Sequence, residues 1–229
     1  MFTRNTIIIL VLLLFLVTIF GYYMKTPTYK GRGYCEIDDA YIHPKVYTNF
    51  ISEKEKNYII EKAEPSFRES KLVSGLISDI RKSETAWIKR EDPVIKKIIQ
   101  RVCKITNIPF ENSEKMQVVK YKPNGYYKPH YDASCDDKKE CVEFEKNGGQ
   151  RLITMLIYLN DDFTGGYTDF PNLKQKYTAE AKQGLLFYSL QKDGNKCHPL
   201  SLHAGTEIKE GTKYIANIWL RESEYKDSA

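Results

Sequence analysis

The chain has 229 residues and a formal net charge of +5 at pH 7, with 17 tyrosines and 10 phenylalanines. This length fits one folded domain with short extensions, and the aromatic content allows a sizeable core and favours β-structure. Its lysines and arginines are scattered and form no basic stripe with interleaved aromatic residues, which argues against a nucleic-acid-binding protein.

Residues 1–24 carry a single charged side chain, Arg4, and are almost wholly aliphatic or aromatic between Ile7 and Phe20. Because a helix that crosses a membrane needs roughly 20 predominantly apolar residues, we predict that this segment is an N-terminal transmembrane signal anchor. A cleaved signal peptide is the alternative. The sequence after Phe20 contains no cleavage site with paired small residues, which disfavours that alternative.

The side of the membrane on which the rest of the chain lies is open on sequence grounds. Three basic residues follow the apolar stretch between positions 25 and 32, and the positive-inside rule alone places the following domain in the cytosol. The cysteines favour the other side, because disulfides persist in oxidising compartments. Cys135 and Cys141 could close a small loop, although the sequence does not fix any pairing. We expect a lumenal domain. The chain has five cysteines, Cys35, Cys103, Cys135, Cys141 and Cys197.

Residues 25–40 are polar, show no periodicity and are predicted to be a linker. A first strand is expected within residues 41–50. A helix follows it, since Ser52 and Glu55 have the spacing of a capping box, in which the two residues satisfy each other's backbone N–H groups at a helix start.

A second helix is predicted from residue 93. Asp92 suits the N-cap, and Pro93 suits the first helical position, where a missing N–H is tolerated. One face of this helix is apolar at helical spacing and is expected to pack on a sheet. Its apolar residues are Ile95, Ile98, Ile99 and Val102.

The second half of the chain has the pattern of a β-rich core. Short apolar segments alternate with polar turns that contain glycine, asparagine or aspartate, which is typical of a sandwich or barrel. With the two leading helices, the pattern predicts an α+β domain over residues 41–223, followed by a tail of residues 224–229. Strands are expected at residues 116–121, 152–159, 185–190 and 214–221.

Three residues have the side chains of a metal site. His130 and Asp132 are two residues apart, so on an extended chain both side chains point the same way and can meet one ion. His203 lies far downstream in a short strand-like segment. Two imidazoles and one carboxylate form the facial triad of non-haem Fe(II) oxygenases. His130 taken alone could equally be a polar turn residue. His198 is a rival ligand, which its loop context disfavours, and His43 is expected to be structural.

Lys213 supplies a cation next to this candidate site. It begins the last predicted strand, where it shares one face with Ile215, Asn217 and Trp219. A lysine on the inward face of an apolar strand is costly unless it meets an anion. The distal carboxylate of 2-oxoglutarate is an anion that would meet this need.

With these motifs in this order, the chain resembles the prolyl 4-hydroxylases of the Fe(II)/2-oxoglutarate dioxygenase superfamily. The resemblance covers residues 41–221, and several motifs in order are more specific than any one of them. They are residues 117–121, 127–132, 149–151, 165–166, 169–171, 199–205 and 213–219.

The resemblance implies a double-stranded β-helix, or jelly roll, that holds iron inside its open end. It implies hydroxylation of C4 of peptidyl proline with release of succinate and CO2, with Fe(II), 2-oxoglutarate and L-ascorbate as cofactors. The substrate would be a proline-rich protein in the extended polyproline II form. A membrane-anchored enzyme of this kind is expected in the lumen of the endoplasmic reticulum or Golgi.

The resemblance also implies roles for individual residues. The iron ligands would be His130, Asp132 and His203. Lys213 would pair with the C5 carboxylate of 2-oxoglutarate, and Tyr121 and Thr168 would donate hydrogen bonds to the same group. The substrate groove would be lined by Tyr127, Arg151 and Trp219.

Three features depart from the family pattern: Tyr167 where glutamate is frequent, Thr206 where cysteine is frequent, and a loop around residues 135–146 that is longer than expected. They leave the substrate preference and the disulfide pattern open. The alternatives are a 2-oxoglutarate oxygenase that acts on lysyl residues or on nucleic-acid bases, and a non-catalytic jelly-roll binding module.

Overall fold

The computed structural model describes residues 41–70, 79–134, 142, 144–191 and 197–227. All of them belong to one compact unit, Gly31–Ala229. The predicted signal anchor and linker lie outside the described residues. Among the residues that are described, no helix has the length and apolar character needed to cross a membrane.

The two predicted helices form as expected. Helix α2 spans Glu53–Ala63, and both hydrogen bonds of its Ser52–Glu55 capping box are present. Helix α3 spans Pro93–Thr106 and is capped by Asp92, whose carboxylate accepts from two backbone N–H groups of the first turn. The predicted apolar face of α3 is fully buried. The described residues also contain four short 3-10 helices: η1 (Glu64–Ser66), η2 (Phe110–Asn112), η3 (Pro171–Leu173) and η4 (Pro199–Ser201).

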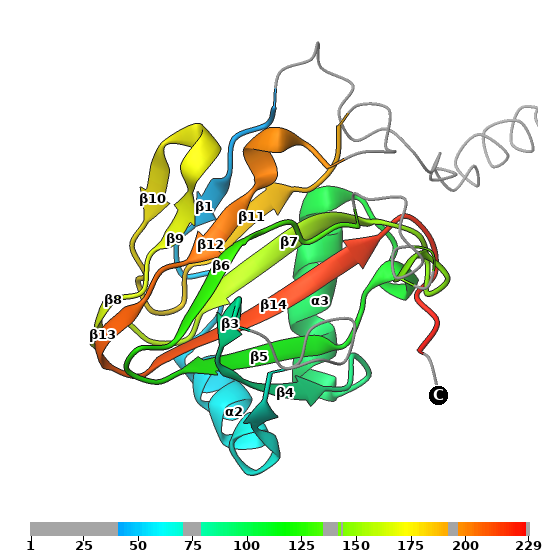
Figure 1. Cartoon of the computed structure of the whole chain (residues 1–229). Coiled ribbons are helices and arrows are strands. Elements are labelled where there is room, and N and C mark those ends of the chain that lie inside the picture. Colours follow the sequence, from blue (N-terminus) through cyan, green and yellow to red (C-terminus); the bar gives the residue numbers. More distant parts are fainter. Residues whose placement is uncertain (1–40, 71–78, 135–141, 143, 192–196, 228–229) are drawn as a thin grey trace, which may run out of the picture. The chain divides into compact units, whose positions relative to one another are not determined.

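Most of the regular secondary structure of the described residues is sheet, consistent with a jelly roll, and all its strand pairs are antiparallel. The larger sheet has the strand order β1-β11-β7-β14-β5-β4-β2. In Figure 1, α2 and α3 lie behind this sheet and strands of the smaller sheet lie in front of it. Its strands are β1 (Lys45–Tyr47), β2 (Arg68–Glu69), β4 (Glu84–Ile88), β5 (Met116–Tyr121), β7 (Arg151–Tyr158), β11 (Gly184–Tyr188) and β14 (Lys213–Arg221).

The smaller sheet has the order β10-β9-β12-β6-β3, and a two-stranded ribbon pairs β13 with β8. These strands are β3 (Arg81–Lys82), β6 (Tyr126–His130), β8 (Phe163–Gly165), β9 (Thr168–Phe170), β10 (Gln175–Tyr177), β12 (His203–Gly205) and β13 (Ile208–Gly211).

The four predicted core strands are confirmed to within about two residues at each end, as is usual for boundaries of this kind. The predicted first strand over 41–50 was too long, because only Lys45–Tyr47 pairs, with β11. The short strands of the smaller sheet escaped prediction, since three-residue segments carry little periodic signal.

The register of β14 determines which side chains lie beside one another on its inward face. Lys213 lies opposite Tyr121 of β5, and Asn217 lies opposite Gln117 of the same strand. On its other side, Trp219 lies opposite Thr154 of β7. Since alternate residues of a strand share a face, Lys213, Asn217 and Trp219 all point into the space between the two sheets, as the sequence predicts.

Candidate active site

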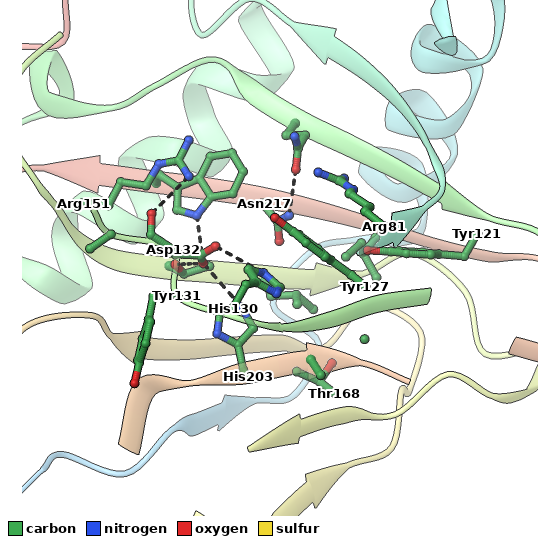
Figure 2. Close-up of a pocket in the computed structure, with 18 of the residues that line it drawn as sticks. Arg81, Tyr121, Tyr127, His130, Tyr131, Asp132, Arg151, Thr168, His203 and Asn217 are labelled. Atoms are coloured by element: carbon green, nitrogen blue, oxygen red, sulfur yellow. Dashed lines mark hydrogen bonds and ion pairs between the residues drawn. The ribbon is translucent and has the colours of Figure 1, made fainter. Parts of the chain in front are cut away.

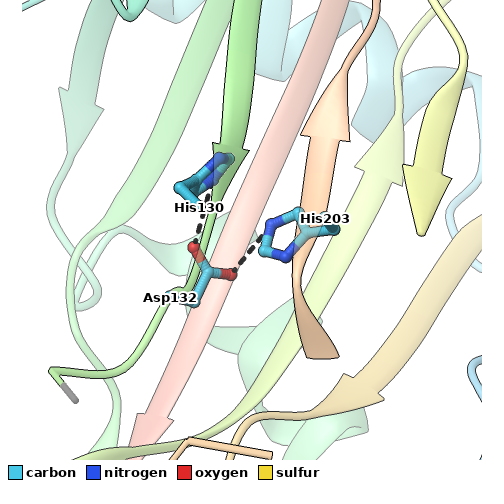
Figure 3. A group of neighbouring side chains, drawn as sticks. All are labelled: His130, Asp132 and His203. Carbon is cyan, nitrogen blue, oxygen red and sulfur yellow. Dashed lines mark ion pairs between the residues drawn. The ribbon is translucent and has the colours of Figure 1, made fainter. Parts of the chain in front are cut away.

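The three predicted metal ligands come together at the ends of β6 and β12. His130 is the last residue of β6 and lies directly opposite His203, the first residue of β12. Asp132 follows two residues later and turns its carboxylate towards both rings (Figure 3). One ligand atom from each of the three residues lies within 4.8 Å of the other two. The structure therefore forms the facial triad that the motif spacing predicts.

The distances within this triad suit a shared ion. Nε2 of His130 lies 3.8 Å from Asp132 Oδ1, and Nε2 of His203 lies 3.7 Å from Oδ2. These separations are too long for hydrogen bonds, yet all three groups face one point. Two imidazoles and a carboxylate with open positions are the donor set of non-haem Fe(II) sites, so the residues present fit that metal.

Both histidines are held in the tautomer that a metal requires. Nδ1 of His130 lies 2.9 Å from the carbonyl of Lys128, and Nδ1 of His203 lies 2.9 Å from the carbonyl of Ser201. Because a carbonyl only accepts, each Nδ1 carries the proton, and each Nε2 is left with its lone pair directed at Asp132. This second contact is the usual support of a metal-binding histidine.

The protonation states agree with this geometry. Burial, together with the neighbouring His203, lowers the pKa of His130. Burial alone would raise the pKa of Asp132, but the nearby His203, His130 and Arg151 outweigh it and hold that pKa below its ordinary value. A neutral imidazole and an ionised carboxylate are the forms that bind metal.

Asp132 is fixed by two donors from the larger sheet. Its Oδ2 accepts from Thr154 Oγ1 at 2.5 Å and from Trp219 Nε1 at 3.0 Å. Hydrogen bonds to an ionised acceptor are the strong ones, so this pair sets the direction of the carboxylate. Thr154 was missed in the sequence analysis. Thr154 can donate to Asp132 because it lies in β7 opposite Trp219. This register depends on the pairing of β7 with β14, which are distant in the sequence.

Lys213 lies on the wall of the same cavity, away from solvent, with 2% of its surface exposed. Its Nζ donates to the carbonyl of Gly166 at 2.6 Å and lies 5.5–5.9 Å from the ring centres of Tyr121, Tyr158 and Phe163. No acidic residue of the described chain pairs with it. Burial lowers the pKa of Lys213 to about 7. A buried ammonium group without a counter-ion is poised for an anionic ligand.

The other two predicted anchor residues lie beside Lys213. Tyr121 is its cross-strand neighbour. Thr168, in β9, accepts a hydrogen bond from the Tyr158 hydroxyl at 2.8 Å, which leaves its own hydroxyl proton free to donate. Burial raises the pKa of Tyr121, which keeps its hydroxyl a donor.

One cavity of about 490 Å³ connects these groups (Figure 2). All nine residues to which the family resemblance assigns roles line it, so the structure brings together the triad, the lysine with its two hydroxyl neighbours and the three residues predicted for the substrate groove. They are His130, Asp132, His203, Lys213, Tyr121, Thr168, Tyr127, Arg151 and Trp219.

The residues predicted to line the substrate groove also contact the metal-ligand residues or one another. The Tyr127 ring stacks on His130, with centroids 3.5 Å apart, and the Arg81 guanidinium lies 4.7 Å from the centre of that tyrosine ring. Arg151 lies 3.6 Å from the centre of the Trp219 ring. Arg81 also lines the cavity, and it was missed because it lies in a two-residue strand.

Arg151 is held from behind by a buried ion-pair network. Its Nε and Nη2 donate to the two carboxylate oxygens of Glu114 at 2.6 and 2.8 Å. Arg221 donates to Glu114 at 2.7 Å, and both Glu114 and Arg221 are almost fully buried. Glu114 was also missed. It lies just before a predicted strand, and its partners are distant in the sequence.

The rival histidine is accounted for otherwise. His198 accepts the N–H of Leu200 and stacks on Tyr41, with centroids 4.6 Å apart. It does not line the cavity. Cys197 is disulfide-bonded, whereas Cys103 is free. The suggested loop closure by Cys135 and Cys141 lies outside the described residues.

Comparison with known proteins gives the same assignment. Residues 116–221 match the 2OG-Fe(II) oxygenase superfamily. A protein of Acanthamoeba polyphaga mimivirus named "Putative prolyl 4-hydroxylase" is 44% identical over 193 residues, which cover 84% of this chain and 80% of that protein. Prolyl 4-hydroxylase 1 of Arabidopsis thaliana is 33% identical, over 77% of this chain and 68% of its own length.

A solved structure supports the fold as well. The viral collagen prolyl hydroxylase of Paramecium Bursaria Chlorella virus-1, in complex with 2OG, is 33% identical, with a TM-score of 0.63. The match covers 78% of this chain and 95% of that one. The chain belongs to the prolyl 4-hydroxylase family of the 2OG-Fe(II) oxygenase superfamily.

Proposed function

We propose that this protein is an Fe(II)- and 2-oxoglutarate-dependent dioxygenase that hydroxylates C4 of peptidyl proline and releases succinate and CO2. One observation carries the proposal. A facial triad and a buried lysine without an acidic partner among the described residues share one cavity. Relatives named as prolyl hydroxylases support the choice of proline as the target.

In this proposal each group of the site has one task. His130, Asp132 and His203 hold Fe(II), which when bound supplies the activation of dioxygen for decarboxylation and hydroxylation. Lys213 pairs with the distal carboxylate of 2-oxoglutarate, and the hydroxyls of Tyr121 and Thr168 donate to the same carboxylate.

The remaining residues of the cavity orient the Asp132 carboxylate and shield the substrate from water. Thr154 and Trp219 keep the Asp132 carboxylate in one direction. The rings of Tyr127 and Trp219 offer flat apolar surfaces to a pyrrolidine ring, and the Arg151 guanidinium packs on the Trp219 ring. These walls keep water from the reacting carbon, which limits side reactions.

We further propose that residues 1–24 anchor the protein in a membrane, residues 25–40 form the linker, residues 41–223 form the catalytic domain and residues 224–229 form a tail. The apolar N-terminal composition supports the anchor. The disulfide at Cys197 supports a lumenal domain, in the endoplasmic reticulum or Golgi. L-ascorbate is proposed as the reductant that restores ferrous iron, on the family resemblance.

Succinate release tests the proposed reaction. The enzyme, with Fe(II), ascorbate and 2-oxoglutarate, is expected to release succinate in proportion to added proline-rich peptide. An otherwise identical peptide with alanine in place of proline is the control. Succinate release with a lysine-containing peptide instead would move the assignment to lysyl hydroxylation, and release with neither would contradict the proposal.

A further inference from the structure

Trp87 is an unusual side chain at the edge of the cavity. It lies in β4 between the buried residues Ala86 and Ile88, yet 48% of its own surface is exposed. Of the six exposed large apolar side chains in the described part of the chain, only Trp87 lines the cavity. Its indole N–H has no hydrogen-bond partner within that part. A tryptophan in this position is available to a ligand.

The strand register connects Trp87 to the centre of the cavity. Trp87 lies opposite Gln117 of β5, and Gln117 lies opposite Asn217 of β14. Directly opposite residues share one face of a sheet, so these three side chains form a continuous row. All three line the cavity, and Asn217 is labelled in Figure 2.

The amide pair in this row, Gln117 and Asn217, has a free donor and a free acceptor that can bind a peptide backbone. Asn217 Nδ2 donates to Gln117 Oε1 at 3.1 Å. Whichever way the two amides are oriented, this bond uses one donor and one acceptor and leaves one amide NH2 and one amide oxygen for a ligand. The carbonyl groups of a polyproline II chain make no internal hydrogen bonds, so they are suitable partners for the free NH2 group.

The distance between Trp87 and the metal site limits how a bound peptide can be positioned. The ring centres of Trp87 and Trp219 are 6.2 Å apart, and Trp219 is bonded to Asp132 at 3.0 Å. The Trp87 ring therefore lies at most on the order of 10 Å from that carboxylate, which is within the span of about three residues of a polyproline II helix at about 3.1 Å each. That helix has about three residues per turn, so the residue three positions from the target faces the same side as the target.

We propose that Trp87 and the Gln117–Asn217 amide pair form a second proline-binding subsite, which holds the residue three positions from the proline that is hydroxylated. The Trp87 ring stacks on the pyrrolidine of that residue, and the amide pair binds the main chain between the two prolines. The inference rests on the proposed function, because it places an extended proline-containing substrate in the cavity. It assigns a preference for proline at every third position.

Two peptides test this subsite. One has proline at every third position, and the other keeps only the central proline and has alanine at the outer proline positions. For the wild-type holoenzyme we expect KM to be roughly three- to tenfold lower for the first peptide, as for one aromatic contact. Trp87→Ala should remove this difference by raising KM for the first peptide alone, and Trp87→Phe should keep most of it.

Controls separate the subsite from general effects. Ile105→Ala removes an exposed apolar side chain of α3 that does not line the cavity and should change neither KM. Gln117→Met should raise KM for both peptides, since a main-chain contact does not depend on the outer prolines. Equal KM values for the two peptides in the wild type, or an equal effect of Trp87→Ala on both, would overturn the subsite.

Direct binding keeps this inference separate from the proposed function. Peptide Kd values measured without oxygen should show the same preference and the same loss in Trp87→Ala. If the wild type hydroxylated neither peptide, the proposed function would fail. The binding comparison would still decide whether Trp87 binds the outer proline.

Discussion

Trp219 donates its indole N–H to Oδ2 of Asp132 at 3.0 Å, across 87 positions of the sequence. The tryptophan lies in β14 of the larger sheet, whereas Asp132 follows β6 of the smaller sheet. This hydrogen bond therefore joins the predicted metal ligand Asp132, next to the smaller sheet, to a strand of the larger sheet. Trp219 has two proposed tasks, since it also lines the cavity where the substrate ring would lie.

Trp219→Phe keeps an aromatic ring but removes the N–H that Asp132 accepts. Asp132 then keeps only the Thr154 bond in this direction, so its carboxylate is less well oriented. We expect Fe(II) affinity to fall roughly 10- to 100-fold, as for other groups that support metal ligands. Titration with Fe(II) under anaerobic conditions measures this change. Unchanged affinity would show that the indole N–H does not orient the ligand.

Thr154→Val removes the second donor to Asp132 with little change of volume. We expect a loss of metal affinity of the same order, and Thr154→Ser should restore most of it because the hydroxyl returns. Thr164→Val is the matched control, because Thr164 is an exposed residue of β8 that does not line the cavity. A loss in the serine variant as large as in the valine variant would point to packing instead of the hydrogen bond.

Lys213→Ala should weaken the binding of the cosubstrate 2-oxoglutarate. Removal of a charge-assisted hydrogen bond costs about 1.5–3 kcal/mol, which predicts a rise of roughly ten- to a hundredfold in KM for 2-oxoglutarate. Metal affinity without 2-oxoglutarate should stay unchanged, because the Lys213 ammonium group donates to the Gly166 carbonyl and, within the described part of the chain, forms no hydrogen bond or ion pair with the triad. A KM equal to that of the wild type would refute the assigned anchor.

The pH dependence of KM for 2-oxoglutarate follows from the same lysine. Burial lowers the pKa of Lys213 to about 7 in the free enzyme. Below that pH the ammonium form is already present, and above it binding requires uptake of a proton. KM should therefore be flat on the acidic side and rise up to about tenfold per pH unit on the alkaline side. Lys213→Arg stays charged throughout, so this rise should be absent from its profile.

Glu114→Gln tests the ion-pair network behind Arg151. The glutamate is buried and binds both Arg151 and Arg221, so the substitution leaves two guanidinium groups with one neutral partner. We expect the free energy of unfolding to fall by about 3–5 kcal/mol, as for other broken buried ion pairs. Chemical denaturation measures this loss, with Glu84→Gln, on the exposed Lys122 pair, as the control. Similar stability of the two variants would contradict the prediction.

The sequence predicts the triad well because its signals are local. His130 and Asp132 share one motif, and His203 and Lys213 lie in two others, so their order alone indicates the chemistry. Helix α3 is equally clear, since Asp92, Pro93 and its apolar face agree. Each of these features can be read within a short window.

The parts that sequence reasoning missed depend on pairing between distant strands. Thr154 meets Asp132 only where a strand of the larger sheet faces the end of β6 in the smaller sheet, and Glu114 meets Arg221 across 107 positions. Arg81 lies in a strand of two residues, which is too short for a periodic signal, and Trp87 joins the cavity through the pairing of β4 with β5. None of these contacts is encoded by spacing along the chain, so none could be predicted without the register.

Mass spectrometry of a proline-rich peptide after incubation with the enzyme, Fe(II), 2-oxoglutarate and ascorbate tests the central claim most directly. The account predicts the mass of one added oxygen, localised by fragmentation to proline, present with the wild type and absent with Asp132→Ala. An unmodified peptide, or an added oxygen localised to another residue, would contradict it.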